Sequence, residues 1–284
     1  MKTSRSIWGK IVAVLRATVV GWVIALVLQV VWSALLVANL RLTPAVPWAA
    51  PTILVIVWCA WNFLGGKWGP RKSAEARRQY LRARPVSGGV LGWSLVAGAL
   101  SIASLCGLWI VMTQLVRIPS MTLPQMENAP LWEVAVMLGA ASLIGPFMEQ
   151  AGIWGYSQVM LERAFRVPVA VLIVSVTFAF GPHPPPGAPL WPKLVFYCLA
   201  SASFGSLAAI TQSILPSLAS HIGGDLVFFS LVWIHDGERP LIAESGADTM
   251  FWIHVAQAVV FALLAVLAFV QLAKMAARQP NAAP

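Results

Sequence analysis

Long runs of apolar residues follow one another along the chain, separated by short polar segments. A helix needs about 20 such residues to cross a hydrocarbon core of roughly 30 Å. The candidate spans cover residues 17–39, 46–65, 88–115, 131–158, 168–183, 191–212, 215–235 and 250–273. This pattern predicts an all-α fold, a polytopic membrane helical bundle of about eight transmembrane helices.

Lysine and arginine gather in alternate segments between these runs, and in short loops they mark the cytoplasmic side of a membrane. With the N-terminus inside, 15 of the 19 basic residues fall on the cytoplasmic side. The densest cluster occupies residues 67–84, whereas the acidic segment 236–248 falls outside. The charge distribution therefore predicts that both termini are cytoplasmic.

The composition excludes a soluble protein, because only 10% of the residues are charged and 59% are hydrophobic, whereas soluble domains carry about 25% charged residues. A net charge of +9 would suit nucleic acid. These cations lie in loops between spans, however, where they fix orientation and can contact anionic lipid headgroups. The three cysteines stand singly and form neither a disulfide framework nor a thiolate metal site. We therefore expect membrane lipid as a partner and no nucleic acid.

Ionisable groups inside a span cost several kcal/mol and require a function or a partner. Glu149 lies in the fourth span, 14 residues before Arg163, and His183 ends the fifth span, 17 residues after Arg166. At about 1.5 Å per residue they rise roughly 21 and 25 Å from the same cytoplasmic turn. Two antiparallel neighbours would bring this carboxylate and imidazole to a similar depth, as a water-activating pair requires.

His221 and Asp225 stand four residues apart in the seventh span, so they share one helix face. Such a pair suits either metal ligation or the stabilisation of a developing oxyanion. All four polar groups also have purely structural interpretations, as hydrogen bonds between helices or as an interfacial histidine. Their clustering on the C-terminal spans favours a shared site, whereas His235 and His254 are interpreted as structural.

At these residues the sequence resembles the CPBP family, the CAAX-protease and bacteriocin-processing family of intramembrane proteases. The family pattern is Glu-Glu-x-x-x-Arg on one helix, Phe-x-x-x-His on the next, and His-x-x-x-Asn or Asp on a later one. The corresponding segments here read EQAGIW, FAFGPH and HIGGD. Glu149, His183, His221 and Asp225 match, and the resemblance covers roughly residues 131–235.

The chain departs from this pattern at two positions of the first motif and by one place in the second. Gln150 replaces the second Glu, Trp154 replaces Arg, and Phe178 and Phe180 each stand one place away from the family's Phe. Without the Arg, a buried Glu149 should ionise less readily. Without the second carboxylate, any two-carboxylate or metal-binding scheme is weakened.

The resemblance implies that Glu149 and His183 activate water for peptide hydrolysis. It also implies that His221 and Asp225 position this water or stabilise the tetrahedral oxyanion, which would require a protonated Asp225 because an ionised carboxylate cannot donate. A metal-free glutamate mechanism and a single divalent metal such as Zn²⁺ both stay open, since two His and one carboxylate could hold zinc.

Other intramembrane proteases are excluded by the sequence. It contains no His-Glu-x-x-His for a site-2-type zinc protease and no Gly-x-Ser-Gly for a rhomboid-type serine nucleophile. The segment IGGD has Ile222 where a presenilin-type Gly-x-Gly-Asp motif needs glycine. The CPBP interpretation therefore has no rival among these classes.

Three functional hypotheses follow. The first is an intramembrane CAAX-type endopeptidase that acts on a membrane-bound or lipidated peptide. The second is a catalytically inactive family member that binds a membrane-protein partner, and the third is a transporter or channel that uses the polar cluster as a relay. The absence of obvious inverted repeats disfavours the third. A bacterial cytoplasmic (inner) membrane is the expected location.

The motifs also suggest a division of the chain into three parts. Residues 1–130 would hold three transmembrane helices and the basic cytoplasmic loop. Residues 131–235 would form the core that carries the polar motifs. Residues 236–284 would comprise an outer loop, the last transmembrane helix and a short tail.

Overall fold

The computed structural model describes residues 6–43, 46–119, 130–183, 187, 189–232 and 239–278. Within these ranges the chain is helical and contains no strand, which confirms the all-α class. Five helical stretches are long and apolar enough to cross a membrane: Ile7–Leu42, Gly88–Leu115, Leu131–Glu162, Leu190–Thr211 and Thr249–Ala277. Ala49–Leu64 and Val167–Ala179 are shorter apolar helices. The count of eight spans and the cytoplasmic termini stay predictions.

The chain divides into two compact units, with the boundary inside helix α7 (Val167–Ala179) after Val174. Unit 1 joins residues 1–84 to 122–174, and unit 2 joins 85–121 to 175–284. The division into three parts by motif content stays a prediction, and His235 lies outside the described residues. Besides its part of α7, unit 1 contains α1 (Ile7–Leu42), α2 (Ala49–Leu64), α3 (Arg71–Leu81), α5 (Leu131–Glu149), the π-helix η2 (Gln150–Ser157) and α6 (Gln158–Glu162). Unit 2 contains α4 (Gly88–Leu115), α8 (Leu190–Thr211), α9 (Leu215–Val227), the π-helix η3 (Phe228–Val232), α10 (Ile242–Ser245) and α11 (Thr249–Ala277).

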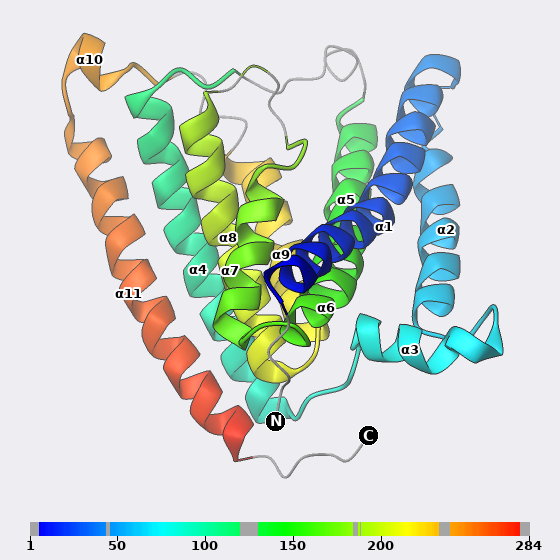
Figure 1. Cartoon of the computed structure of the whole chain (residues 1–284). Helices are drawn as coiled ribbons and strands as arrows, with labels where there is room; N and C mark the ends of the chain where they lie inside the picture. The colour runs from blue at the N-terminus through cyan, green and yellow to red at the C-terminus, as the bar shows by residue number, and fades with distance from the viewer. Residues whose placement is uncertain are drawn as a thin grey trace. The chain divides into compact units, whose positions relative to one another are not determined.

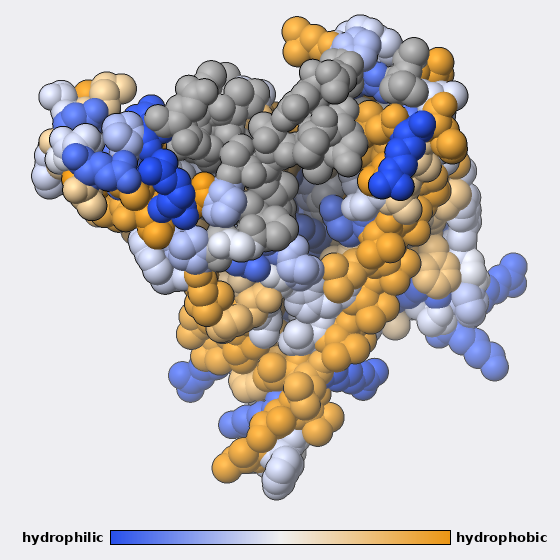
Figure 2. All heavy atoms as spheres, turned by 90° about the horizontal axis from the view of Figure 1, so that it is seen from above, coloured by the Kyte–Doolittle hydropathy of each residue, from blue (hydrophilic) through white to orange (hydrophobic). Residues whose placement is uncertain are grey.

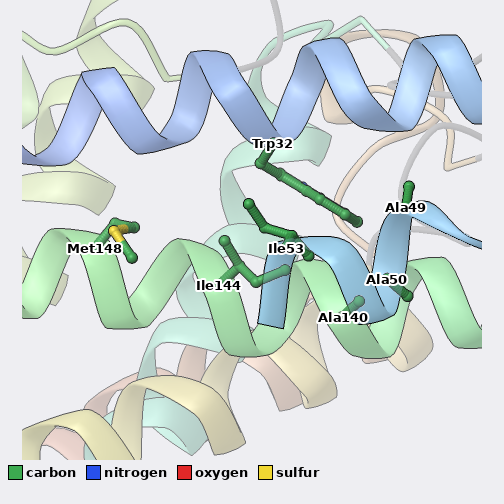
Figure 3. Close-up of a cluster of buried hydrophobic side chains, with 7 residues drawn as sticks. All are labelled: Trp32, Ala49, Ala50, Ile53, Ala140, Ile144 and Met148. Carbon is green, nitrogen blue, oxygen red and sulfur yellow. The ribbon is translucent and has the colours of Figure 1, made fainter. Parts of the chain in front are cut away.

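The apolar core of unit 1 lies where α1, α2 and α5 meet (Figure 3). Trp32 of α1 contributes its indole, α2 contributes Ile53, and α5 contributes Ile144 and Met148. Ile144 and Met148 are four residues apart and share one face of α5, and both are fully buried. This face fixes the rotation of α5 about its axis and therefore the direction in which the next residue, Glu149, leaves the helix.

A buried asparagine closes the turn between α1 and α2. The Asn39 side-chain oxygen accepts a hydrogen bond from the Ala49 backbone nitrogen at 2.7 Å, and its amide nitrogen donates to the carbonyls of Thr43 and Val46 at 3.1 and 3.0 Å. Backbone groups at helix ends need such partners, above all in an apolar surrounding. Asn39 therefore holds the hairpin that carries part of the core of unit 1.

The basic segment between the second and third predicted spans forms a helix, α3, that the sequence analysis did not predict. In unit 1 this helix lies across the end of α2 (Figure 1). Arg77 is buried and holds the turn, because its guanidinium donates to the Phe63 carbonyl at 2.7 Å and to the Trp68 carbonyl at 2.6 Å. The guanidinium also lies over the Phe63 ring, 4.6 Å from its centroid. One of the loop cations is thus a structural residue.

In unit 2, α11 packs along the length of α4 (Figure 1). Gly107 of α4 allows close approach, since a methyl group there would lie 2.9 Å from the His254 carbonyl oxygen of α11. Two hydrogen bonds join the same helices: Ser104 Oγ donates to the Ala258 carbonyl at 2.8 Å, and the Gln257 amide donates to the Ala103 carbonyl at 2.9 Å. Small and polar side chains of this kind are typical of helix association in lipid.

Apolar side chains cover much of the outer surface, and Figure 2 shows broad hydrophobic bands on one face. Only 17% of the most apolar stretch of α1 and 11% of that of α11 is buried. On α1, for example, Val19, Val23 and Val27 are exposed at intervals of four residues. A soluble monomer rarely exposes apolar patches this large, so these faces fit contact with lipid acyl chains.

Candidate functional site

Glu149 is the last residue of α5, and the π-helix η2 begins at the next residue. Pro146, inside α5, lacks a backbone N–H and weakens the helix just before this junction. The side chain of Glu149 is half-buried, beside the fully buried Met148 of the unit 1 core. π-Helical turns are rare and often occur at functional sites. The first motif therefore lies at a specialised point of the helix.

All eight residues of η2 are buried, and a close crossing with α1 fixes the segment. A methyl group on Gly152 would lie 3.1 Å from the Ala25 backbone nitrogen and closer still to the Gly21 carbonyl oxygen. The Tyr156 hydroxyl donates to the Leu64 carbonyl at the end of α2, at 3.0 Å. The backbone that follows Glu149 is thus held by two other helices of unit 1.

Arg82, which follows α3, also binds η2. Its guanidinium donates to the Trp154 carbonyl at 3.0 Å and forms an ion pair of 2.8 Å with Glu162. Burial lowers the pKa of the Arg82 guanidinium, and the nearby Glu162 carboxylate opposes this shift. Trp154, at the position of the family's Arg, is itself fully buried. A guanidinium from elsewhere in the chain therefore contacts the backbone at this motif position.

His183 lies beyond the end of α7, four residues after Ala179, and is not part of a helix. Its Nε2 lies 2.6 Å from the Phe178 carbonyl oxygen. Because a carbonyl only accepts, Nε2 carries the proton in the neutral ring and Nδ1 carries the lone pair. The Phe178 ring lies 4.3 Å from the imidazole, centroid to centroid. The chain leaves the helix before His183, which brings Phe178 into contact despite the sequence offset of one place.

His221 and Asp225 lie on α9, with His221 Nε2 3.6 Å from Asp225 Oδ1. This separation confirms that the two side chains share a helix face, just outside hydrogen-bond distance. His221 is buried and stacks on Phe204 of α8, with ring centroids 4.3 Å apart and an interplanar angle of 23°. Asp225 is half-buried. The second π-helix, η3, begins at Phe228, three residues after Asp225, whereas η2 contains most of the first motif.

The helix that carries His221 lies against a glycine of α4, which gives a first prediction. A methyl group on Gly98 would lie 2.7 Å from Ser220 Cβ and closer still to its hydroxyl. Gly98→Ala should therefore cost about 1–3 kcal/mol through overpacking, measured as a lower melting temperature of the purified protein. A methyl group on Gly92 of the same helix would meet nothing within 4 Å, and Gly92→Ala is the control. Equal melting temperatures for the two variants would contradict the prediction.

Helix α8 supplies two aromatic residues that the sequence analysis did not identify. Tyr197 stacks on His183, with ring centroids 4.0 Å apart and an interplanar angle of 16°, and Phe204 stacks on His221 as described. The two aromatic residues are seven positions apart, which places them on one face of α8, about two turns or 10.5 Å apart. The spacing of aromatic residues across the sixth predicted span was the available signal.

The structure thus brings three of the four predicted residues together in unit 2. His183 and His221 both lie against the same face of α8, and Asp225 accompanies His221. Glu149 belongs to unit 1, and its sharing of a water with His183 stays a prediction. Among the described residues, no three or more His, Cys, Asp or Glu side chains form a group that could hold a metal.

The comparison with protein families gives one match. Residues 130–227 match the family model described as type II CAAX prenyl endopeptidase Rce1-like. The matched residues are similar to Rce1-like endopeptidases of the CPBP family. No curated protein and no solved structure matches the chain. The Rce1-like region covers about a third of the chain and contains Glu149, His183, His221 and Asp225. Together with the five long apolar helices, it supports an integral membrane protein related to CAAX-type proteases.

Proposed function

We propose that this protein is an intramembrane endopeptidase that hydrolyses a membrane-bound or lipid-modified peptide with an activated water. The observation that supports this most strongly is the coincidence of the Rce1-like match with all four motif residues. Inside this region, Glu149 occupies an α-to-π junction and both histidines are oriented by aromatic partners. The proposal extends to eight spans with both termini in the cytoplasm of a bacterial cell, which alkaline phosphatase fusions to each terminus would test.

In the proposed mechanism the carboxylate of Glu149 takes a proton from the attacking water, and His183 orients that water through Nδ1. The resulting hydroxide adds to the scissile carbonyl, and the same proton can then be delivered to the leaving nitrogen. His221 would face the oxyanion that forms on the carbonyl oxygen. Asp225, 3.6 Å from His221 Nε2, would accept from that nitrogen, so His221 would donate to the oxyanion from Nδ1 as an imidazolium that carries a proton on both nitrogens. No step requires a protonated Asp225 or a metal.

A second candidate function has its own support. Gln150 and Trp154, which replace the family's Glu and Arg, are both fully buried in η2. A catalytically inactive member that binds a membrane protein would tolerate these replacements, because they serve packing. In that case substitutions of Glu149 and His183 would leave function intact, whereas changes on packed helix faces would abolish it.

The proposal can be tested with purified protein reconstituted in liposomes and a panel of lipid-modified, membrane-anchored peptides with a fluorescent reporter. His183→Ala should lower kcat by about 10²- to 10⁴-fold, the range of a positioned acid–base group. His254→Gln is the control, because this half-buried histidine bonds Gln257 on α11, at 3.0 Å. Peptide cleavage that is equal in the two variants would reject the catalytic role of His183.

A further inference from the structure

His183 is held by side-chain contacts rather than by a helix. The chain leaves α7 at Ala179, and the His183 backbone N–H donates to the Gly181 carbonyl at 2.8 Å in a turn rather than in a helix. The imidazole Nε2 lies 2.6 Å from the Phe178 carbonyl oxygen, and the ring has two aromatic neighbours, Phe178 and Tyr197. A hydrogen bond to a carbonyl selects the tautomer but does not by itself fix the plane of the ring. A group against the face of the ring fixes that plane.

The ring of Tyr197 lies against the face of the His183 imidazole, and other side chains hold Tyr197 in place. Its ring is nearly parallel to the imidazole, at 16°, whereas the Phe178 ring is tilted by 55°. Phe196 contacts Tyr197 edge-on, with centroids 5.3 Å apart, and Phe178 does so at 6.2 Å. Farther along α8, Ser201 and Phe204 are buried. The tyrosine therefore projects from a packed part of the helix and can act as a rigid platform.

We propose that Tyr197 is a positioning residue whose aromatic ring holds the His183 imidazole in the plane that directs Nδ1 toward the attacking water. The ring and not the hydroxyl carries this role, because the contact is a parallel stack of the two planes. The stack fixes the plane of the imidazole, and the hydrogen bond from Nε2 to the Phe178 carbonyl fixes the rotation of the ring within that plane, so Nδ1 keeps one direction. The catalytic consequence rests on the proposed peptidase function, whereas the orientation of the ring does not.

Activity measurements separate the ring from the hydroxyl. Tyr197→Phe keeps the stack and should retain kcat within about twofold, whereas Tyr197→Leu should lower kcat about tenfold, in line with the loss of one aromatic pair. KM should change little in either variant, because Tyr197 acts through His183 and not on the peptide. Val195→Ala is the control, since Val195 is 40% exposed on the same helix. Equal loss of kcat in the Phe and Leu variants would overturn the proposal.

A spectroscopic measurement tests the same proposal without any substrate. The chain has four histidines, so ¹⁵N-histidine NMR in nanodiscs can assign His183 from the signals lost in His183→Gln. In the unmodified protein we expect the Nε2–H tautomer and ring protons shifted upfield by Tyr197. Tyr197→Phe should preserve both features, and Tyr197→Leu should remove the upfield shift. If the upfield shift is absent from the unmodified protein, the proposal is overturned even if the Tyr197→Leu variant fails to fold.

The two experiments also distinguish this inference from the proposed function. If the NMR signals behave as expected while the unmodified protein cleaves no peptide, the positioning role stands and the peptidase proposal fails. If the protein cleaves peptide but Tyr197→Leu leaves both kcat and the His183 signals unchanged, the positioning role is rejected and the peptidase proposal stands.

Discussion

Glu149→Gln is expected to lower peptide cleavage by about 10²- to 10⁴-fold and to leave the protein folded. Glutamine has nearly the same shape as glutamate and can form similar hydrogen bonds, but it cannot accept the proton of an attacking water. The neighbouring Met148 and Ile144 hold α5 through the unit 1 core, so the change should not move the helix. The loss should appear in kcat, with KM nearly constant, because the proton transfer belongs to the transition state.

The liposome assay used for His183 measures this effect, with thermal unfolding as the check on folding. Glu75→Gln is the matched control, since the Glu75 side chain is 64% exposed on α3. A Glu149→Gln variant that cleaves peptide at the rate of the control would exclude a catalytic carboxylate at this position. A loss of cleavage that is accompanied by unfolding would assign Glu149 a structural role instead.

Arg82→Met is expected to destabilise unit 1 by about 3–5 kcal/mol, because removing one partner of a buried ion pair leaves the other charge uncompensated. The side chains of Arg82 and Glu162 are only 4% and 13% exposed, at 2.8 Å. Glu162 would keep its 2.8 Å hydrogen bond from Gln158, which does not neutralise it. The variant would also lose the bond to the Trp154 carbonyl in η2.

An exposed ion pair in the same segment provides the control. Arg78 and Glu75 are 3.0 Å apart with side chains 63% and 64% exposed, and Arg78→Met should cost at most about 1 kcal/mol. Denaturation of the purified protein measures both free energies of unfolding. Adding Glu162→Gln to Arg82→Met should recover part of the loss, since the uncompensated charge is then removed. Similar losses in the Arg82 and Arg78 variants would contradict a stabilising role for the buried pair.

The helices were predictable because apolar runs of transmembrane length must satisfy their backbone groups internally. The residues at which the helices begin and end were harder to predict. α1 begins at Ile7 rather than at residue 17, since Ser6 accepts a hydrogen bond from the Gly9 backbone at 3.2 Å and caps the helix. α7 ends at Ala179, before the residue 183 that hydropathy indicated. Pro182 and Pro184 disfavour helical conformation around His183, a signal that was present in the sequence.

The candidate site was predictable only in part. Motif spacing placed His221 and Asp225 on one face because four residues make about one helical turn, and their 3.6 Å separation agrees. The π-helices η2 and η3 have no comparable sequence signal, since their hydrogen bonds skip one more residue without a fixed composition. The stacking of His183 on Tyr197 depends on the tertiary packing of the segment after α7 against α8 within unit 2, which a single sequence does not reveal. The pairing of Glu149 with His183 stays a prediction.

The cations of residues 67–84 consequently divide into two kinds. Arg77 and Arg82 are buried components of the architecture, whereas the other five cations are exposed: Lys67, Arg71, Lys72, Arg78 and Arg84. In the proposed topology these five would set the orientation during insertion. Replacing all the cations of residues 67–84 would therefore not distinguish a protein that inserts in the inverted orientation from one that misfolds. Replacing only the five exposed residues would separate the proposed topogenic signal from the framework that supports the helix after Glu149.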